Sequence, residues 1–251
     1  MRTLELTAAR DAVRSTAAAL LALRERSDVE RGRPLADQGD ALAHELVVGR
    51  LRDAFPHDVI LSEGGEPVLA ARRPQRLWVV DPLDGTREFS SGDRTDWAVQ
   101  VALVEGDTPV LGVVALPACG IELDTGTALQ CAPGPGGPLR IAVSRTRPPA
   151  VAEQLADALG AELVPLGSVG AKTVAVIDGT ADLYVHAGGQ YEWDSAAPVA
   201  VARAAGLEAC RIDGSPLRYN QPDPYLPDLL IARPAVAAAV RAVLKSLLLP
   251  A

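Results

Sequence analysis

The sequence predicts an α+β first half that is joined to an α/β second half. Two long helical patterns precede a quick succession of strand-like runs, and later the pattern alternates between strands and helices. Between these parts lies a run of prolines and glycines, residues 133–138, which cannot continue a helix or a central strand. We therefore expect one intertwined functional unit with two halves, residues 1–138 and 139–251.

The first half begins with two helices and continues with strands. Apolar residues recur at helical spacing over residues 7–26 and 40–54, and a polar loop through Arg33 and Pro34 separates the two patterns. Short apolar runs then predict strands, with two weaker candidates at the end, at residues 59–61, 77–80, 97–104, 110–116, 121–123 and 128–131.

The second half alternates between the two types of element. Strands are expected at residues 139–143, 162–166, 183–186, 208–212 and 229–231. Helices are expected at residues 149–159, 169–177, 193–205 and 236–248. A proline-rich loop, residues 216–227, precedes the last strand.

Composition limits the class of protein. With 48% hydrophobic and 22% charged residues, the 251-residue chain can build a sizeable core. A net charge of −8 argues against a nucleic-acid polymer as partner, and three scattered cysteines support neither a disulfide framework nor a zinc site. Charged residues interrupt the first segment, and no apolar run reaches the roughly 18 residues of a membrane span, so we expect a cytoplasmic protein without a membrane partner.

Residues 81–86, Asp-Pro-Leu-Asp-Gly-Thr, carry the strongest functional signal. They follow a buried-looking strand, so two carboxylates and a turn arrive together at the edge of a sheet. Such carboxylates repel each other unless a cation lies between them, and hard oxygen ligands suit Mg²⁺. An ordinary turn explains Asp-Pro and Asp-Gly equally well, but Gly85 and Thr86 add free N–H groups and a hydroxyl that suit phosphate and water.

Two further carboxylates accompany this turn. Glu63 ends an apolar strand as Asp81 does, so neighbouring strands would place both acids at one rim. Asp194 precedes the small-residue helix that contains Ala196 and Ala197. Taken alone, Glu63 is explained as a solvated turn residue and Asp194 as a helix N-cap.

A rival interpretation comes from the haloacid-dehalogenase-type phosphatases, which carry D-x-D-G-T with a nucleophilic first aspartate. This chain has one more residue between Asp81 and Asp84. Because side chains alternate along a strand with period two, the insertion turns the first acid to the other face. We therefore reject a covalent aspartyl mechanism.

Together, Glu63, residues 81–86 and the sequence Trp193-Asp194-Ser195-Ala196-Ala197 resemble the inositol monophosphatase superfamily of Mg²⁺-dependent, Li⁺-sensitive phosphatases. Within that superfamily the chain is similar to the CysQ-type 3′-phosphoadenosine-5′-phosphate phosphatases in Arg87-Glu88-Phe89, in Gly167-Ser168 with Lys172, and in residues 214–220. The resemblance covers nearly the full length and implies a layered α-β-α-β-α sandwich. One departure is Gly64-Gly65, where the family usually has a second acid, and it affects loop rigidity more than metal binding.

The resemblance also implies roles for these residues. Glu63, Asp81 and the carbonyl of Leu83 would hold one Mg²⁺, while Asp81, Asp84 and Asp194 would hold a second. A third, weaker ion would lie near Glu63 and Asp40, so two or three ions are expected.

The attacking water is assigned by the same resemblance. Thr86 paired with Asp40 would orient and deprotonate it, with Asp37 as the competing choice for the acid. The backbone amides of Gly85 and Thr86 would hold the phosphate.

The remaining contacts concern the rest of the substrate. Ser168 and Lys172 are the candidates for the 5′-phosphate, with the amides at the start of the helix after Ser168. Arg87 is expected either to contact a second anionic group or to pair with Glu88. Arg218 and Tyr219 are expected to approach the base or its phosphate. A surface lysine on an ordinary capped helix is the plain alternative for Lys172.

The implied function is release of the 3′-phosphate of 3′-phosphoadenosine 5′-phosphate, a by-product of sulfate assimilation, to give AMP and phosphate. An inositol- or sugar-phosphate phosphatase of the same fold is the alternative. A non-catalytic nucleotide or metal sensor, which Gly64-Gly65 would permit, is a third hypothesis. Since members of that family are often dimers, the resemblance leaves a homodimer as an open alternative for the oligomeric state.

Overall fold

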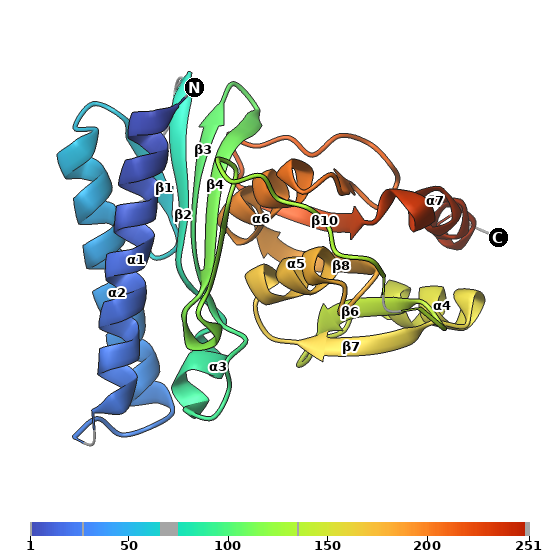
Figure 1. Ribbon diagram of the computed structural model, residues 1–251, viewed down its shortest axis with the longest axis horizontal. Coiled ribbons are helices and arrows are strands. Elements are labelled where there is room, and N and C mark those ends of the chain that lie inside the picture. The colour runs from blue at the N-terminus through green and yellow to red at the C-terminus, as the bar shows by residue number, and fades with distance from the viewer. Residues whose placement is uncertain (1, 27, 66–74, 135, 249–251) are drawn as a thin grey trace.

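The computed structural model describes residues 2–26, 28–65, 75–134 and 136–248. Figure 1 shows five layers: helices α1 and α2, a first sheet, helices α5 and α6, a second sheet, and helices α4 and α7. The helices are α1 (Thr3–Glu25), α2 (Arg33–Ala54), α3 (Thr86–Ser91), α4 (Ala150–Leu159), α5 (Val169–Asp178), α6 (Glu192–Ala204) and α7 (Pro234–Leu248), with a 3-10 turn at Pro117–Cys119. This is the α-β-α-β-α sandwich that the family resemblance implies.

Each sheet has five strands among the described residues. The first has the order β1-β2-β3-β4-β5 and the second the order β7-β6-β8-β10-β9. The strands of the first sheet are β1 (Val59–Ser62), β2 (Arg76–Asp84), β3 (Ala98–Glu105), β4 (Thr108–Leu116) and β5 (Ile121–Asp124). Those of the second are β6 (Arg140–Ser144), β7 (Glu162–Leu166), β8 (Leu183–Tyr191), β9 (Glu208–Cys210) and β10 (Tyr225–Ala232).

The carboxyl ends of the parallel strands determine where side chains gather. In the first sheet β1 runs parallel to β2, and in the second β6 runs parallel to both β7 and β8. The loops that follow parallel strands leave a sheet at the same edge. Functional residues that follow β1, β2, β6, β7 and β8 are therefore positioned at two facing edges.

Some predicted elements differ from the structure. Helix α2 begins at Arg33 rather than at Asp40, because Pro34 occupies the first helical turn, where its missing N–H costs nothing. Residues 128–131 form no strand. Strands β2 and β8 extend to Asp84 and Tyr191, further than their apolar runs suggested, while helix α3 was not expected at all.

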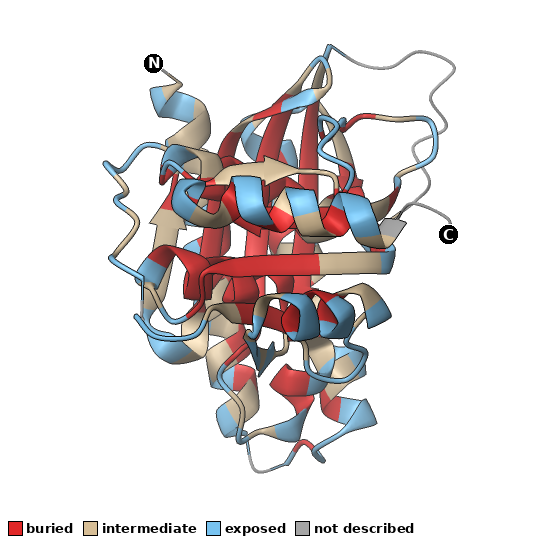
Figure 2. Cartoon of the chain, turned by 90° about the vertical axis from the view of Figure 1, so that its right-hand side faces the viewer, coloured by how far each residue is buried: buried red, intermediate tan, exposed pale blue. Residues whose placement is uncertain are grey.

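The core lies between the two sheets. One cluster of buried side chains joins strands β2, β3 and β4 to helices α5 and α6 and to strands of the second sheet. Helix α6 approaches β4 closely at Gly112, where a Cβ atom would lie 2.8 Å from the carbonyl oxygen of Ala197. The small residues after Asp194 thus pack on β4. Figure 2 shows that burial follows the strands, while exposed residues lie on outer helix faces and loops.

Helices α1 and α2 form a second core against the outer face of the first sheet, and α4 and α7 form a third. The division of the chain into units 1–138 and 139–251 stays a prediction. The three cysteines, all within the described residues, are free. None of the helices that the structure describes combines the length and hydropathy needed to span a bilayer.

Candidate active site

Glu63 follows strand β1, and Asp81 lies near the end of its parallel partner β2. Ser62 of β1 is in register with Val80 of β2, and the N–H of Glu63 donates to the carbonyl oxygen of Val80 at 3.2 Å. Asp81 is 1% exposed. The prediction that the two strands bring both acids to one rim is therefore confirmed.

Asp84 reaches the same site through an irregularity in β2. The register between β2 and β3 shifts between Asp81 and Asp84, as in a β-bulge. A regular strand would turn the two side chains to opposite faces. The bulge corrects this, and oxygen atoms of Asp81, Asp84 and Asp194 lie within 4.8 Å of one another.

Asp84 also binds the start of helix α5. Its Oδ2 atom accepts the backbone N–H of Gly170 at 3.0 Å and the amide of Gln100. Unpaired N–H groups at a helix N-terminus favour a negative charge. Helix α5 is therefore positioned by Asp84, 86 residues away from Gly170 in the sequence.

Asp194 lies in the first turn of helix α6. Its Oδ2 atom accepts the N–H of Tyr191 at 2.6 Å, so it caps the helix and faces the other acids at once. Glu192, two residues before Asp194, is buried and accepts the N–H groups of Asn220 and Gln221 at 2.7 and 2.8 Å. This contact fixes the beginning of α6, a role that sequence reasoning did not assign.

The acidic cluster is electrostatically strained, and its donor set fits a divalent cation. Burial, and then the charges of Asp84 and Glu63, raise the pKa of Asp81 well above its usual range. Burial raises the pKa of Asp84 to about 6, and burial with the charge of Asp84 raises that of Asp194 to about 7. The Oδ2 atom of Asp81 is buried without a hydrogen-bond partner among the described residues. A metal ion would supply the missing partner and the compensating charge.

The hydroxyl of Thr86 lies at the beginning of α3, next to Asp40 of α2. Its Oγ1 atom is 3.1 Å from Oδ1 of Asp40 and 3.1 Å from the carbonyl oxygen of Leu83. Asp37 instead lies 3.7 Å from Arg33. Of the two competing acids, the structure brings Asp40 to Thr86.

Two glycines permit this arrangement. A Cβ atom on Gly39 would lie 2.5 Å from a ring carbon of Phe89, so the missing side chain lets α2 approach α3. Gly85 has φ +87°, and a Cβ there would lie 3.3 Å from the side chain of Ser168. The turn before α3 therefore requires glycine both for its backbone conformation and for space.

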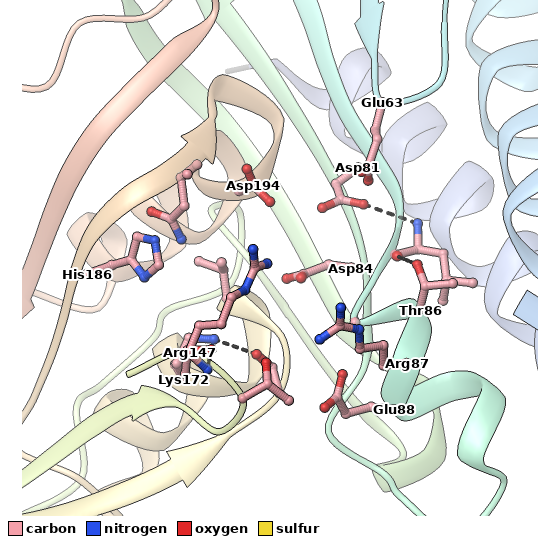
Figure 3. Close-up of a pocket in the computed structure, with 18 residues that line it drawn as sticks. Glu63, Asp81, Asp84, Thr86, Arg87, Glu88, Arg147, Lys172, His186 and Asp194 are labelled. Carbon is pink, nitrogen blue, oxygen red and sulfur yellow. Dashed lines mark hydrogen bonds between the residues drawn. The ribbon is translucent and has the colours of Figure 1, made fainter. Parts of the chain in front are cut away.

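A cavity of about 270 Å³ collects these groups between the two sheets. Figure 3 shows Asp81, Asp84 and Asp194 around one space, with Arg87 and Arg147 reaching toward it. The predicted site residues on its lining are Glu63, Asp81, Leu83, Asp84, Gly85, Thr86, Arg87, Lys172 and Asp194. Asp40 lines an adjacent hollow that also includes Glu63 and Leu83.

Ser168 and Arg218 do not line the cavity. The side chain of Ser168 caps α5 by accepting the N–H of Ala171 at 2.9 Å, and Asp84 accepts the N–H of Gly170. The amides expected to bind a 5′-phosphate are thus already committed. Arg218 pairs with Asp107 at 2.8 Å in the turn between β3 and β4.

Tyr219 and Lys172 are also committed to contacts within the protein. Tyr219 is fully buried, and its hydroxyl lies 3.1 Å from that of Ser195, so it does not reach a ligand base. Lys172 donates to the carbonyl oxygen of Gly167 at 2.5 Å, and its Nζ atom lies 5.2 Å from the ring centroid of Tyr184. Burial lowers its pKa to about 8.

Glu88 pairs with Arg145 rather than with its neighbour Arg87. The predicted alternative pairing of Arg87 is therefore wrong.

Sequence reasoning missed several lining residues, among them Arg147, Gln190 and His186. Burial lowers the pKa of His186 to about 4, so the ring is neutral near pH 7. Arg147 follows the end of β6 and belongs to no recognisable motif. Its position at the carboxyl end of a parallel strand is the signal that could have found it.

The comparisons with known proteins agree with this geometry. The model of the inositol monophosphatase family matches residues 4–245. A 3′-phosphoadenosine 5′-phosphate phosphatase of Mycobacterium leprae is 47% identical over 238 residues, which cover 90% of this chain and 88% of that protein. The 3′(2′),5′-bisphosphate nucleotidase CysQ of Escherichia coli is 35% identical over 198 residues, 74% of this chain and 80% of that protein.

The solved structures extend the similarity to the fold. CysQ from Bacteroides thetaiotaomicron superimposes with a TM-score of 0.80 at 29% identity, covering 91% of this chain and 97% of that chain. An inositol monophosphatase from Anabaena gives a TM-score of 0.77 at 19% identity and covers 98% of this chain and 97% of that one. The family model and the identities to the relatives together lead to one conclusion: this chain belongs to the inositol monophosphatase family.

Proposed function

We propose that this chain is a Mg²⁺-dependent phosphatase that removes the 3′-phosphate of 3′-phosphoadenosine 5′-phosphate and gives AMP and phosphate. The observation that carries the proposal is the identity of 47–50% to proteins named for this activity, over 86–90% of the chain. The acidic cluster of Asp81, Asp84 and Asp194 supports it together with the Thr86–Asp40 pair, because a sensor that only binds has no need of a pair that orients a water.

The residues that would hold the metal are those at the strand ends. Glu63, Asp81 and the carbonyl of Leu83 would bind one Mg²⁺, and Asp81, Asp84 and Asp194 a second, with a weaker third near Glu63 and Asp40. When bound, the ions supply charge neutralisation and lower the pKa of a coordinated water.

The chain's own groups position the nucleophile. Thr86 has one hydroxyl proton, and the carboxylate of Asp40 accepts it more strongly than the neutral carbonyl of Leu83 does. The lone pairs of Thr86 then remain available to accept a hydrogen bond from water. Burial raises the pKa of Asp40, which brings this carboxylate closer to the range of an effective base.

The reaction forms one bond to phosphorus and breaks another. The water oxygen attacks phosphorus and gives up a proton to the carboxylate of Asp40. The bond from phosphorus to the ribose 3′ oxygen breaks, and the released ribose oxygen takes up a proton from solvent. The amides of Gly85 and Thr86 hold the transferred phosphate in this proposal, and the ammonium group of Lys172 adds positive charge nearby. No covalent enzyme intermediate is required.

A substrate panel tests the proposal directly. Purified protein with Mg²⁺ is given 3′-phosphoadenosine 5′-phosphate, inositol 1-phosphate and fructose 1,6-bisphosphate, and phosphate release is measured together with the nucleotide product. We expect the highest kcat/KM for the nucleotide and AMP as the product. A preference for inositol 1-phosphate or the sugar phosphate would overturn the substrate, and no turnover at all would favour a sensor.

Three further properties belong to the same proposal. Millimolar Li⁺ is expected to inhibit turnover. The chain is expected to act in the cytoplasm, where the nucleotide arises from sulfate assimilation. A homodimer stays a prediction that the molar mass in solution tests.

A further inference from the structure

Two arginines line the cavity from opposite halves of the chain. Arg87 belongs to the first turn of α3, and Arg147 follows the end of β6. Figure 3 shows both side chains reaching from opposite sides into the space beside Asp84, whose carboxylate lies between the two guanidinium groups in this view. Two like charges that share one cavity repel each other unless an anion lies between them.

Neither arginine forms an ion pair with any residue that the structure describes. Arginines elsewhere in this part of the chain mostly pair with a carboxylate, as Arg10 does with Asp124. The acid nearest in sequence to Arg87 is Glu88, which is committed to Arg145. The acids of the cluster would be neutralised by metal ions, which leaves both guanidinium groups available to another anion.

The other candidates for binding a second anion are already occupied. The first N–H groups of helix α5 are used by Asp84 and Ser168. Lys172 is fully buried, and its ammonium group donates to Gly167. Arg147 is exposed at the edge of the cavity, so its side chain is free to move toward a ligand.

We propose that Arg87 and Arg147 form a two-sided clamp for the second phosphate group of a nucleoside bisphosphate, with the first phosphate at the acidic cluster. This inference rests on the proposed function and identifies how its substrate is selected. Guanidinium groups match phosphate oxygens in bidentate geometry, and phosphate dianions gain more from two such groups than monoanions do. The clamp selects a bisphosphate over a monophosphate with the same scissile bond.

The test compares 3′-phosphoadenosine 5′-phosphate with adenosine 3′-phosphate, which lacks only the 5′-phosphate. In Arg147→Gln we expect kcat/KM for the bisphosphate to fall about ten- to a hundredfold, as for loss of a hydrogen bond to a charged group. For adenosine 3′-phosphate it should change by less than about threefold, since that substrate does not reach the clamp. Arg87→Gln should act in the same direction, and Arg147→Lys should restore part of the loss.

A matched control and a binding measurement accompany these variants. Arg140→Gln removes a charge from the beginning of β6, outside the cavity, and should leave both substrates unchanged. Inhibition by AMP, which carries only the 5′-phosphate, should weaken by a similar factor in Arg147→Gln but not in Arg140→Gln. Thermal unfolding should be unchanged in Arg147→Gln because its side chain is exposed.

Two outcomes separate the inference from the function on which it rests. If the unmodified protein hydrolyses the bisphosphate and Arg147→Gln slows both substrates equally, the clamp is wrong and the proposed function stands. If the unmodified protein releases phosphate from neither nucleotide, the proposed function fails and the clamp fails with it.

Discussion

Arg145 donates to Glu88 at 2.5 Å and so joins the end of β6 to helix α3. Glu88 is 5% exposed and packs against Gly167, where a Cβ atom would lie 2.4 Å from its Cγ. Because α3 begins with Thr86 and Arg87, this ion pair holds the turn before α3 in the first half against the second half. It also removes Glu88 from the reach of Arg87.

Glu88→Gln is expected to destabilise the protein and to slow turnover. A buried acceptor of a charged hydrogen bond contributes about 1.5–3 kcal/mol, and the neutral amide keeps the shape but loses the charge. Asp107→Asn is the matched control, since the Asp107–Arg218 pair is exposed and should contribute at most about 1 kcal/mol. Urea unfolding measures the stability of both variants, and a kinetic assay measures their turnover. Equal losses in the two variants would contradict the structural role of Glu88.

Gly39→Ala is expected to separate α2 from α3. The added methyl group would lie 2.5 Å from the buried ring of Phe89, so the helix must move and carry Asp40 away from Thr86. A shift of this kind should lower kcat about tenfold or more, because catalytic geometry tolerates little displacement. Gly49→Ala, in the same helix with no atom within 4 Å of the new Cβ, should instead stabilise by about 0.5–1 kcal/mol.

Steady-state kinetics of the two variants measures kcat, and urea unfolding measures their free energy of unfolding. If Gly39→Ala kept full activity, the close approach of α2 to α3 would not be what positions Asp40.

Local patterns in the sequence predicted that Glu63 and Asp81 lie at one rim, but not how Asp84 joins them. Glu63 and Asp81 each end an apolar run, and parallel pairing brings such ends together by geometry alone. The bulge that turns Asp84 to the side of Asp81 has no local signal, because regular alternation predicts the opposite. The family resemblance supplied Asp84 as a ligand without explaining how the chain brings it there.

The sequence also could not predict hydrogen bonds between backbone N–H groups and side chains that are distant along the chain. A serine before a helix predicts an N-cap, and Ser168 does cap α5. The sequence does not show that Asp84 accepts the N–H of Gly170 in the same turn. That contact crosses from the first half to the second and depends on how the two sheets pack. Arg147 was missed for a related reason, since an isolated loop arginine acquires meaning only when the fold brings it to a cavity.

The metal-free protein is expected to lose stability as pH rises from about 5 to about 8. The folded-state pKa values of Asp84 and Asp194 are raised to about 6 and about 7, so between their unfolded and folded values the folded state binds more protons. The free energy of unfolding then falls with increasing pH and levels off above the folded pKa values. Thermal unfolding in excess chelator across this pH range measures it, and a rise in stability over the range would contradict the strained cluster.

Asp194→Asn should remove most of the stabilisation that the protein gains from Mg²⁺. The amide removes one repelling charge, so the metal-free variant should be more stable at pH 8 than the unmodified protein in chelator. The unmodified protein should gain about 2.7 kcal/mol from Mg²⁺ at a hundredfold excess over its Kd, because the ion binds only the folded state. Asp194→Asn should lose most of this gain together with turnover. Asp178→Asn, at the far end of α5, is the matched control and should keep the full response to Mg²⁺. An undiminished response in Asp194→Asn would exclude this carboxylate from the metal site.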